Sequence, residues 1–531
     1  MSSPLNMPVY AAPVSDAEFK PMPALLRLNA ETHPDKTAVI DGERKLSWQE
    51  LQQLVNRIAN RLIKEGLQPG QTVAGLSENS AEYVALYLGV ITAGGCMVPL
   101  SGMAAGDTLG LMIDDCDANF LFVSARNREL VEPLYDRLAK IPTGNRVGLD
   151  FGDAHWATLD AWLADAPDTA PVVEITPDHP FNIIYSSGTT GVPKGILHDH
   201  RMRSLQLARM RKGYGLGENA ITLVSTPLYS NTTLVSALPT LAYGGTVVLM
   251  AKFEPREFLA LSERHKVSHA MLVPVQYERI LRVADFDSFD LSSYRAKLST
   301  SAPLRGRVIR EILDRWPGKI YEIYGLTEGG VSTILDAAAH PNKLDSVGKP
   351  AGGVELRIID EAGKELPIGE IGEIVGRAGA MMRGYYKRDA QTKELLWQSP
   401  EGHWFYRTGD MGRLDEDGFL YVLDRRKDMI ISGGFNIYAA DLEAVLLKHP
   451  DVVDVAVIGV PSEQWGETPL GLVVRRDNGQ VSEAELLEWA NAQLGKAQRL
   501  STLEFRDELP RSTIGKVLKR ELRAPYWEGV K

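Results

Sequence analysis

Cysteine is scarce in this chain, and its scarcity excludes two classes of protein. Cys96 and Cys116 are the two cysteines among 531 residues, too few for the disulfide framework of a small secreted domain. They do not form a CxxC pair, so the ligand spacing typical of a structural zinc site is missing. We expect two reduced, buried thiols, because unpaired cysteine is among the most often buried residues.

An excess of positive charge is also missing. The formal net charge is −11, and no long Lys/Arg run supplies a basic patch, so we expect no nucleic acid partner. An anionic ligand must therefore be held by a local site and not by the overall field. The acidic balance and the lack of a basic amphipathic helix argue against a membrane-surface protein.

Targeting signals and membrane spans are not expected either. Residues 1–23 contain no basic segment followed by an apolar run, and the last residues match no peroxisomal or lipidation signal. Residues 219–251 carry no charge, over more than the ~20 residues of a membrane span. Prolines, hydroxyl side chains and a Gly-Gly pair interrupt this stretch, which predicts a strand at 221–225, a buried helix at 233–241 and a strand at 246–250. We expect a cytoplasmic protein, either a monomer or a homodimer.

No repeat or low-complexity tract organises the chain, and 531 residues need at least two hydrophobic cores. Helix and strand signals alternate as far as residue 300. Examples are a strand at 37–40 and a helix opened by the capping box Ser47–Glu50. This alternation predicts parallel sheets covered by helices. Residues 165–171 predict a surface loop or a sub-domain joint.

The pattern changes after residue 345. Strands at 355–359, 372–375 and 419–423 with glycine turns predict a β-rich region. Residues beyond 424–428 predict a small α+β domain, with helices at 440–447 and 482–494 and strands at 452–460 and 469–474. We expect an α/β fold with a large N-terminal domain (1–425), a hinge (426–428) and a small mobile C-terminal domain (429–531).

The strongest local signal is a loop rich in hydroxyls and glycine. A buried strand at 183–185 is followed by the loop, which consists of Ser186, Ser187, Gly188, Thr189, Thr190 and Gly191 and is followed by Lys194. Glycines let backbone N–H groups approach phosphate oxygens, hydroxyls donate hydrogen bonds, and the lysine supplies charge. The spacing differs from a Walker A loop, because Gly188 lies six residues before Lys194. The alternative is a surface turn.

The order of these residues resembles the phosphate loop of the adenylate-forming superfamily, which includes acyl-CoA synthetases, firefly-type luciferases and peptide-synthetase adenylation domains. The resemblance extends from Thr37 to about Arg523. Further segments resemble family motifs in the family order: 321–328, 405–410, 424–437 and 509–516. The resemblance implies an AMP-forming acid:CoA ligase. Such an enzyme uses ATP, Mg²⁺ and CoA to convert a carboxylic acid to an acyl-AMP and then to an acyl-CoA.

The resemblance also assigns roles in nucleotide binding. Tyr324 lies against the adenine, Thr327 bonds the α-phosphate, Glu328 faces Mg²⁺, and Asp410 with Arg425 holds the ribose. The alternative for Tyr324 is a core tyrosine, and for Glu328 an exposed acid at a helix start. For Asp410 and Arg425 it is a surface ion pair that contributes little to stability. Other nucleotide contacts that the resemblance implies are Ser301, Ala302, Pro303, Glu322, Ile323, Gly325 and Val422.

Lys516 is the implied catalytic residue of the first step, because a lysine bridging the acid and the phosphate would align them and offset their charge. The alternative is a solvated lysine in a basic patch. The family then rotates its C-terminal domain about a hinge, here Lys427, and a segment matching Ser432, Gly433 and Gly434 lines the CoA channel. A tight turn without a partner is the alternative for that segment. Acetylation of Lys516 is a hypothetical off-switch.

The acyl pocket is assigned by analogy. Ser230 stands where coumarate ligases often have a histidine, and no aspartate is present to pair with an amino acid's ammonium. Thr300 replaces a frequent glycine, and Ala439 a frequent proline. We expect a hydroxylated aromatic acid or a fatty acid of moderate length. The pocket residues are Tyr229, Ser230, Asn231, Thr232, Ser236, Thr300, Gly330, Val331 and Ser332.

Other functions stay open at this point. A stand-alone enzyme that loads a carrier-protein thiol, a luciferase-like oxygenase and a nucleotide sensor without turnover are the rivals. About fifteen residues follow Lys516, so we expect no fused carrier domain.

Overall fold

The structure is a computed structural model that describes residues 19–104, 106–186, 193–425, 428–432, 435–495, 498–512 and 515–528. Packing divides the chain into two compact units, which are described separately. The large unit comprises 1–344, 351–355 and 377–406, and the small unit comprises 345–350, 356–376 and 407–531. The domain boundaries at 425 and 428 and the mobility of the C-terminal domain stay predictions.

The first sheet of the large unit has the strand order β15-β14-β13-β12-β10-β11-β1-β2. Neighbours from β14 to β1 are parallel, while β15 and β2 are antiparallel edges. The parallel-rich α/β fold expected from the sequence is thereby confirmed. The strands are β1 (Thr37–Asp41), β2 (Arg44–Ser47), β10 (Ile221–Val224), β11 (Thr246–Leu249), β12 (His269–Leu272), β13 (Ala296–Ser299), β14 (Lys319–Gly325) and β15 (Ser332–Asp336).

The second sheet has the order β19-β9-β8-β4-β3-β5-β6-β7. Its β8–β9 and β9–β19 pairs are antiparallel and the other pairs are parallel. The β8–β9 hairpin carries the predicted phosphate loop, and β19 comes from much later in the chain to lie beside it. The strands are β3 (Thr72–Leu76), β4 (Cys96–Pro99), β5 (Phe120–Val123), β6 (Arg146–Gly148), β7 (Ala157–Thr158), β8 (Pro180–Ser186), β9 (Lys194–Asp199) and β19 (Gly384–Tyr385).

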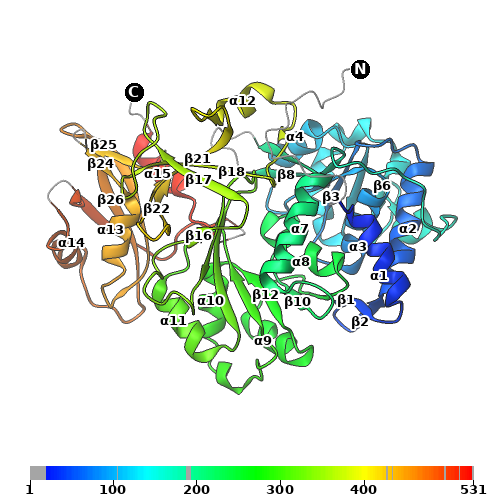
Figure 1. The fold of residues 1–531 in the computed structure, drawn as a ribbon, viewed down its shortest axis with the longest axis horizontal. Helices are drawn as coiled ribbons and strands as arrows, with labels where there is room; N and C mark the ends of the chain where they lie inside the picture. Colours follow the sequence, from blue (N-terminus) through cyan, green and yellow to red (C-terminus); the bar gives the residue numbers. More distant parts are fainter. Residues whose placement is uncertain are drawn as a thin grey trace. The chain divides into compact units, whose positions relative to one another are not determined.

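Helices cover these sheets. Helices α1, α2, α3 and α8 share one apolar core with strands of both sheets, and α7 and α8, drawn in green, lie side by side in Figure 1. The predicted capping box is present, because Ser47 and Glu50 bond each other's backbone N–H at the start of α2. The helices are α1 (Met22–Thr32), α2 (Trp48–Lys64), α3 (Ala81–Thr92), α4 (Asp107–Asp115), α5 (Arg128–Val131), α6 (Leu159–Trp162), α7 (His200–Tyr214), α8 (Asn231–Ala242), α9 (Pro255–Arg264), α10 (Pro274–Leu281), α11 (Gly306–Arg315) and α12 (Asp389–Glu394).

The charge-free stretch forms β10, α8 and β11, as the sequence predicts. Helix α8 begins at Asn231 and not at Thr233, because Ser230 accepts a hydrogen bond from Thr232 N–H and caps the helix. Within the described part of the chain, no helix is both long and apolar enough to cross a bilayer. Both cysteines are free and buried, as expected, and burial raises the pKa of the Cys116 thiol to about 12.

The C-terminal part of the small unit is an α+β fold, as predicted. Its sheet has the order β24-β23-β26-β25, with β27 parallel to β26. Helices α13 and α14 pack on the sheet through one apolar core. The elements are β23 (Ile430–Ser432), β24 (Phe435–Ile437), β25 (Val452–Ser462), β26 (Gly466–Arg475), β27 (Thr502–Arg506), α13 (Ala439–Leu446), α14 (Glu483–Asn491) and α15 (Lys519–Trp527).

The expected β-rich region is present and contributes residues to both units. The division between the two units passes through β17, β18 and β21. In the small unit β21 pairs antiparallel with β22, and in the large unit β20 pairs with the first residues of β21. The strands are β16 (Lys349–Pro350), β17 (Val354–Ile359), β18 (Gly372–Ala378), β20 (Leu396–Gln398), β21 (Trp404–Leu414) and β22 (Leu420–Arg425).

Candidate active site

The hairpin of β8 and β9 positions the predicted phosphate loop. Ser186 ends β8 and pairs with Lys194, the first residue of β9. Ser187, Gly188, Thr189, Thr190 and Gly191 lie outside the described residues, as does the side chain of Ser186. The Lys194 Nζ lies 5.3 Å from the centre of the Tyr385 ring, a distance at which a cation and an aromatic face attract each other.

Thr327 and Glu328 follow the end of β14 and are held by three contacts. The Nε2 atom of His198 lies 2.7 Å from the carbonyl oxygen of Thr327. The Met382 N–H donates to the carbonyl oxygen of Glu328 at 2.8 Å, and the Tyr385 hydroxyl donates to Glu328 Oε1 at 2.9 Å. Both the main chain and the carboxylate of Glu328 are therefore fixed, as a ligand-binding acid requires.

Two glycines let the chain approach the segment that holds Glu328. Gly329 and Gly330 have φ angles of +74° and +77°, which favour glycine. The Gly330 N–H donates to the Ala380 carbonyl at 3.1 Å. A Cβ atom on Gly329 would lie 2.2 Å from that same carbonyl oxygen, so a side chain there would push the two segments apart.

Strands β13 and β14 end beside each other, with Ser299 paired to Glu322. The Glu322 carboxyl is buried, and its Oε1 accepts a hydrogen bond from Leu304 N–H at 3.1 Å. Burial raises the pKa of Glu322 to about 7, although Ser299 and the Leu304 N–H act in the opposite direction. This carboxyl therefore titrates near neutral pH.

The remaining predicted nucleotide contacts of the large unit lie at the ends of these strands. Ile323, Tyr324 and Gly325 end β14, and Tyr324 is half-buried and not a core side chain. Ser301 follows β13 with a φ angle of +77°, rare for a residue with a side chain. Ala302 and Pro303 come directly after it and are at least partly exposed.

The predicted acyl-pocket residues come from three segments: the start of α8, the loop after β13 and the start of β15. The hydroxyls of Thr232 and Ser301 lie 2.8 Å apart and join the first two segments. Ser230, Val331 and Ser332 are buried, and Tyr229 and Thr300 are half-buried. The Ser236 hydroxyl donates to the Thr233 carbonyl of its own helix at 3.1 Å, so this hydroxyl is already engaged within α8.

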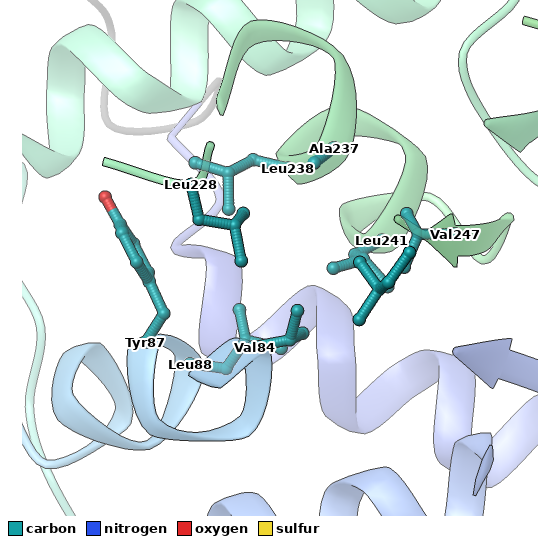
Figure 2. A pocket seen from close by; sticks show the side chains of 9 residues that line it. Val84, Tyr87, Leu88, Leu228, Ala237, Leu238, Leu241 and Val247 are labelled. Carbon is teal, nitrogen blue, oxygen red and sulfur yellow. The ribbon is translucent and has the colours of Figure 1, made fainter. Parts of the chain in front are cut away.

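A small apolar space near α8 is a different feature. Figure 2 shows Val84, Tyr87 and Leu88 of α3 facing Ala237, Leu238 and Leu241 of α8 across it. Its volume is about 10 Å³, roughly that of one water. It is a packing gap in the core and cannot hold an acyl group.

Sequence reasoning missed a buried polar network behind Thr327. Arg203 of α7 is fully buried and donates to Asn182 Oδ1, Gln206 Oε1 and Asn231 Oδ1 and to His198 Nδ1. His198 in turn contacts Thr327, and Asn231 begins α8. The network therefore connects the segment that bears Glu328 with the start of the predicted acyl-pocket helix. The sequence offered no signal that distinguishes Arg203, because α7 contains several other basic residues.

The small unit contains the other predicted ribose-binding pair. Asp410 and Arg425 pair across β21 and β22, and Val422 pairs with Gly412 in the same ladder. The Arg425 Nε lies 3.4 Å from Asp410 Oδ1, and the Asp410 side chain is 7% exposed. A buried carboxylate is costly to desolvate unless it is paired, so this is not the weak surface pair considered as the alternative.

The predicted hinge and CoA channel are partly described. Lys427, Gly433 and Gly434 lie outside the described residues. Ser432 ends β23 and pairs with both Phe435 of β24 and Gly466 of β26. Its segment therefore belongs to the sheet of the C-terminal part.

Lys516 lies on a tight turn. Arg511 and Val517 form a β-bridge, and Ser512 N–H donates to the Lys516 carbonyl at 2.8 Å. The Arg511 guanidinium bonds the Gly515 carbonyl at 2.6 Å and forms an ion pair with Asp454 of β25. Arg511 thus links the main chain next to Lys516 to β25.

Lys519, three residues after Lys516, is not a solvated side chain. Its Nζ lies 2.8 Å from Glu443 Oε1. Burial alone would lower the pKa of Lys519, but the Glu443 and Asp424 carboxylates outweigh burial and raise it. Asp424 also accepts a hydrogen bond from Ala439 N–H at 2.9 Å. Lys519 therefore connects residues that precede and follow the predicted hinge.

No cluster of three or more His, Cys, Asp or Glu side chains suited to a metal occurs among the described residues. Glu328 offers a single carboxylate. Mg²⁺ is commonly held by one or two carboxylates together with substrate phosphates, so this acid fits such a cation without a further protein ligand.

Comparison with known proteins adds to this geometry. Residues 26–386 match the AMP-binding enzyme family, and residues 441–516 match the AMP-binding enzyme C-terminal domain. A feruloyl-CoA synthase of Amycolatopsis sp is 34% identical over 500 residues, 94% of this chain and 97% of that protein. An indoleacetate–CoA ligase of Aromatoleum aromaticum is 32% identical over 93% and 96% of the two chains. The crystal structure of ATP-bound MatB from Rhodopseudomonas palustris has a TM-score of 0.85 at 30% identity, covering 96% and 100%.

Proposed function

The chain belongs to the AMP-binding enzyme family and is an AMP-forming acid:CoA ligase, and we propose that its substrate is an aromatic or arylalkanoic acid. Two relatives named for such acids, feruloyl and indoleacetate, support this proposal. The hydroxyls of Thr232 and Ser301, which lie 2.8 Å apart where the predicted pocket segments meet, suit an acid with a polar ring substituent. A fatty acid of moderate length is the second candidate.

In the proposed first step, a carboxylate oxygen of the acid attacks the α-phosphorus of ATP, and pyrophosphate leaves. Thr327 bonds the α-phosphate, the loop from Ser186 to Lys194 holds the outer phosphates, and Tyr324 stacks on the adenine. Asp410 and Arg425 bind the ribose. Lys516 contacts both the acid and the α-phosphate and offsets the charge that develops there.

Glu328 is the proposed protein ligand for Mg²⁺, which would neutralise charge on the phosphates when bound. The contacts from Met382 and Tyr385 that fix Glu328 support this assignment. They hold the acid in place before the nucleotide arrives, which lowers the cost of ordering it on binding.

In the proposed second step, the CoA sulfur attacks the acyl carbon and AMP leaves. Lys516 must withdraw first, so we propose rotation of residues 429–531 about Lys427, after which Ser432, Gly433 and Gly434 line the thiol channel. Lys427→Pro should then slow full turnover and spare pyrophosphate exchange. We place the enzyme in the cytoplasm as a monomer or homodimer. Two free, buried cysteines suit a reducing compartment.

The observation that carries the proposed substrate class is the Thr232–Ser301 hydroxyl pair, and the one that carries the adenylation step is the double fixation of Glu328 beside Thr327. Acid-dependent release of AMP and pyrophosphate, measured with a panel of aryl, arylalkanoic and fatty acids, tests both. Each acid is assayed with CoA and with a carrier-protein thiol as acceptor. The proposal predicts the highest kcat/KM for an aryl acid with CoA. AMP release with none of the acids would contradict it, and preference for the carrier thiol would favour the rival enzyme.

A further inference from the structure

Tyr385 contacts Glu328 from a strand that lies far away in the sequence. It belongs to β19, is 8% exposed, and packs in an apolar cluster with Ile196, Met382 and Tyr406. Its hydroxyl donates to Glu328 Oε1 at 2.9 Å. A buried phenol needs such a partner, and a bond to an ionised carboxylate is stronger than one between neutral groups.

This contact leaves the Glu328 carboxylate with a defined orientation. A glutamate side chain rotates about several bonds, and one oxygen bonded to a rigid ring removes most of that freedom. The Tyr406 hydroxyl also hydrogen-bonds Glu328. An ionised carboxylate has about four lone-pair sites on its two oxygens, so these contacts orient Glu328 and still leave sites for a cation. The Met382 N–H fixes the main chain of the same residue at 2.8 Å, so one segment holds Glu328 at both ends.

The same ring also lies beside Lys194, the cation that follows the phosphate loop. Tyr385 pairs with Ile196 of β9, and the Tyr386 N–H donates to the Gly195 carbonyl at 2.8 Å. This docking brings the ring to 5.3 Å from Lys194 Nζ. One aromatic side chain therefore lies in contact with the cation of the phosphate loop and with the acid that follows Thr327.

We propose that Tyr385 is a positioning residue for the adenylation step: it orients the Glu328 carboxylate toward the phosphate-bound divalent cation and holds Lys194 at the base of the phosphate loop. This inference rests on the role proposed above for Glu328. It assigns no chemistry to the phenol itself, which neither gives up nor receives a proton in the reaction.

The neighbouring tyrosine supplies a matched control. The Tyr386 hydroxyl donates to Asp117 Oδ2 at 3.2 Å, away from Glu328. Tyr385→Phe and Tyr386→Phe each remove one oxygen atom and keep the ring. Calorimetry measures ATP binding in the absence of acid at increasing Mg²⁺ concentrations. This titration reports on the site without turnover. Pyrophosphate exchange and conversion of supplied acyl-AMP to acyl-CoA report on the two half-reactions.

We expect Tyr385→Phe to raise the Mg²⁺ concentration for half-maximal ATP binding and to lower the pyrophosphate-exchange rate, each by about tenfold or more, since a bond to a charged group is lost. The KM for the acid and the rate from acyl-AMP should not change. In a Glu328→Gln background, Tyr385→Phe should have little further effect on either Mg²⁺ dependence or exchange.

Equal behaviour of Tyr385→Phe and Tyr386→Phe would overturn the inference. So would an equal loss in both half-reactions together with a lower melting temperature, which marks a purely structural role. If the proposed function is wrong, the wild-type enzyme releases no AMP with any acid. The ATP titration still shows whether Tyr385→Phe and Tyr386→Phe differ in the Mg²⁺ concentration for half-maximal ATP binding.

Discussion

Arg203 Nη2 lies 2.9 Å from His198 Nδ1, and this contact determines which nitrogen of the imidazole carries the proton. A guanidinium can only donate, so Nδ1 is the acceptor. Nε2 must then carry the proton, and it donates to the Thr327 carbonyl at 2.7 Å. Burial first, and then the charge of Arg203, hold the pKa of His198 well below its usual range. The neutral Nε2–H tautomer therefore supports Thr327 over the whole physiological pH range.

Arg203→Met should lower the free energy of unfolding by about 3 kcal/mol or more. It leaves buried acceptors of Asn182, Gln206 and His198 with fewer donors, and each unsatisfied group costs about 1–3 kcal/mol. Urea unfolding measures the change. Lys212→Met, on an exposed position of the same helix, is the control and should change stability by no more than about 0.5 kcal/mol. A similar small change for Arg203→Met would refute the importance of the network.

Glu322→Gln should change how stability depends on pH. The folded protein keeps the Glu322 proton up to a pKa of about 7, against an ordinary value of 4.5. The contribution of this carboxyl is therefore complete below pH 4.5 and is lost as the pH rises through 7, by about 3 kcal/mol in total. Urea unfolding at pH 5 and pH 8 should show that the variant loses less stability than the wild type over this interval. Parallel losses would show that Glu322 does not titrate there.

Gly329→Ala should disrupt the contact that holds Glu328. The positive φ and the 2.2 Å approach of the new Cβ to Ala380 O require the two segments to separate. A shift of about 1 Å at a catalytic group can cost about 100-fold in rate, and we expect a loss of that order in pyrophosphate exchange. Gly352→Ala, where a Cβ meets no atom within 4 Å, is the control. Wild-type exchange in Gly329→Ala would contradict the assignment.

Lys519→Met should loosen the region around the predicted hinge. It removes the cation that lies 2.8 Å from Glu443 and that also offsets Asp424, and a loss of about 2 kcal/mol in the free energy of unfolding is expected for a partly buried ion pair. Trypsin should then cut faster after Arg425, Arg426 or Lys427. Arg520→Met, at the exposed neighbouring position, should not alter the cleavage rate. A trypsin cleavage rate in Lys519→Met equal to that of the wild type would show that Lys519 does not stabilise this segment.

The sequence predicted the elements whose signals are local. The capping box at Ser47, the strand before the phosphate loop and the division of residues 219–251 into strand, helix and strand depend on neighbours in the chain. Element ends were less predictable. The start of α8 depends on the direction of the Ser230 side chain, which spacing alone does not reveal.

The supporting residues of the site could not be predicted in this way. His198 and Arg203 contact Asn182 and Asn231 across strand and helix packing, and the sequence around them is typical of an ordinary strand and helix. Tyr385 and Tyr386 are adjacent and chemically identical. Only the register of β19 against β9 decides which of them contacts Glu328, and register is a property of the folded sheet.

The proposed mechanism requires Lys516 to act in adenylation and to be withdrawn before thioester formation. Both half-reactions should be measured in Lys516→Ala, with Arg520→Ala, at a nearby exposed position, as the control. In Lys516→Ala, acid-dependent pyrophosphate exchange should fall by about 10²–10³-fold, while supplied acyl-AMP should be converted to acyl-CoA at the wild-type rate. An equal fall in both half-reactions would contradict the proposed mechanism.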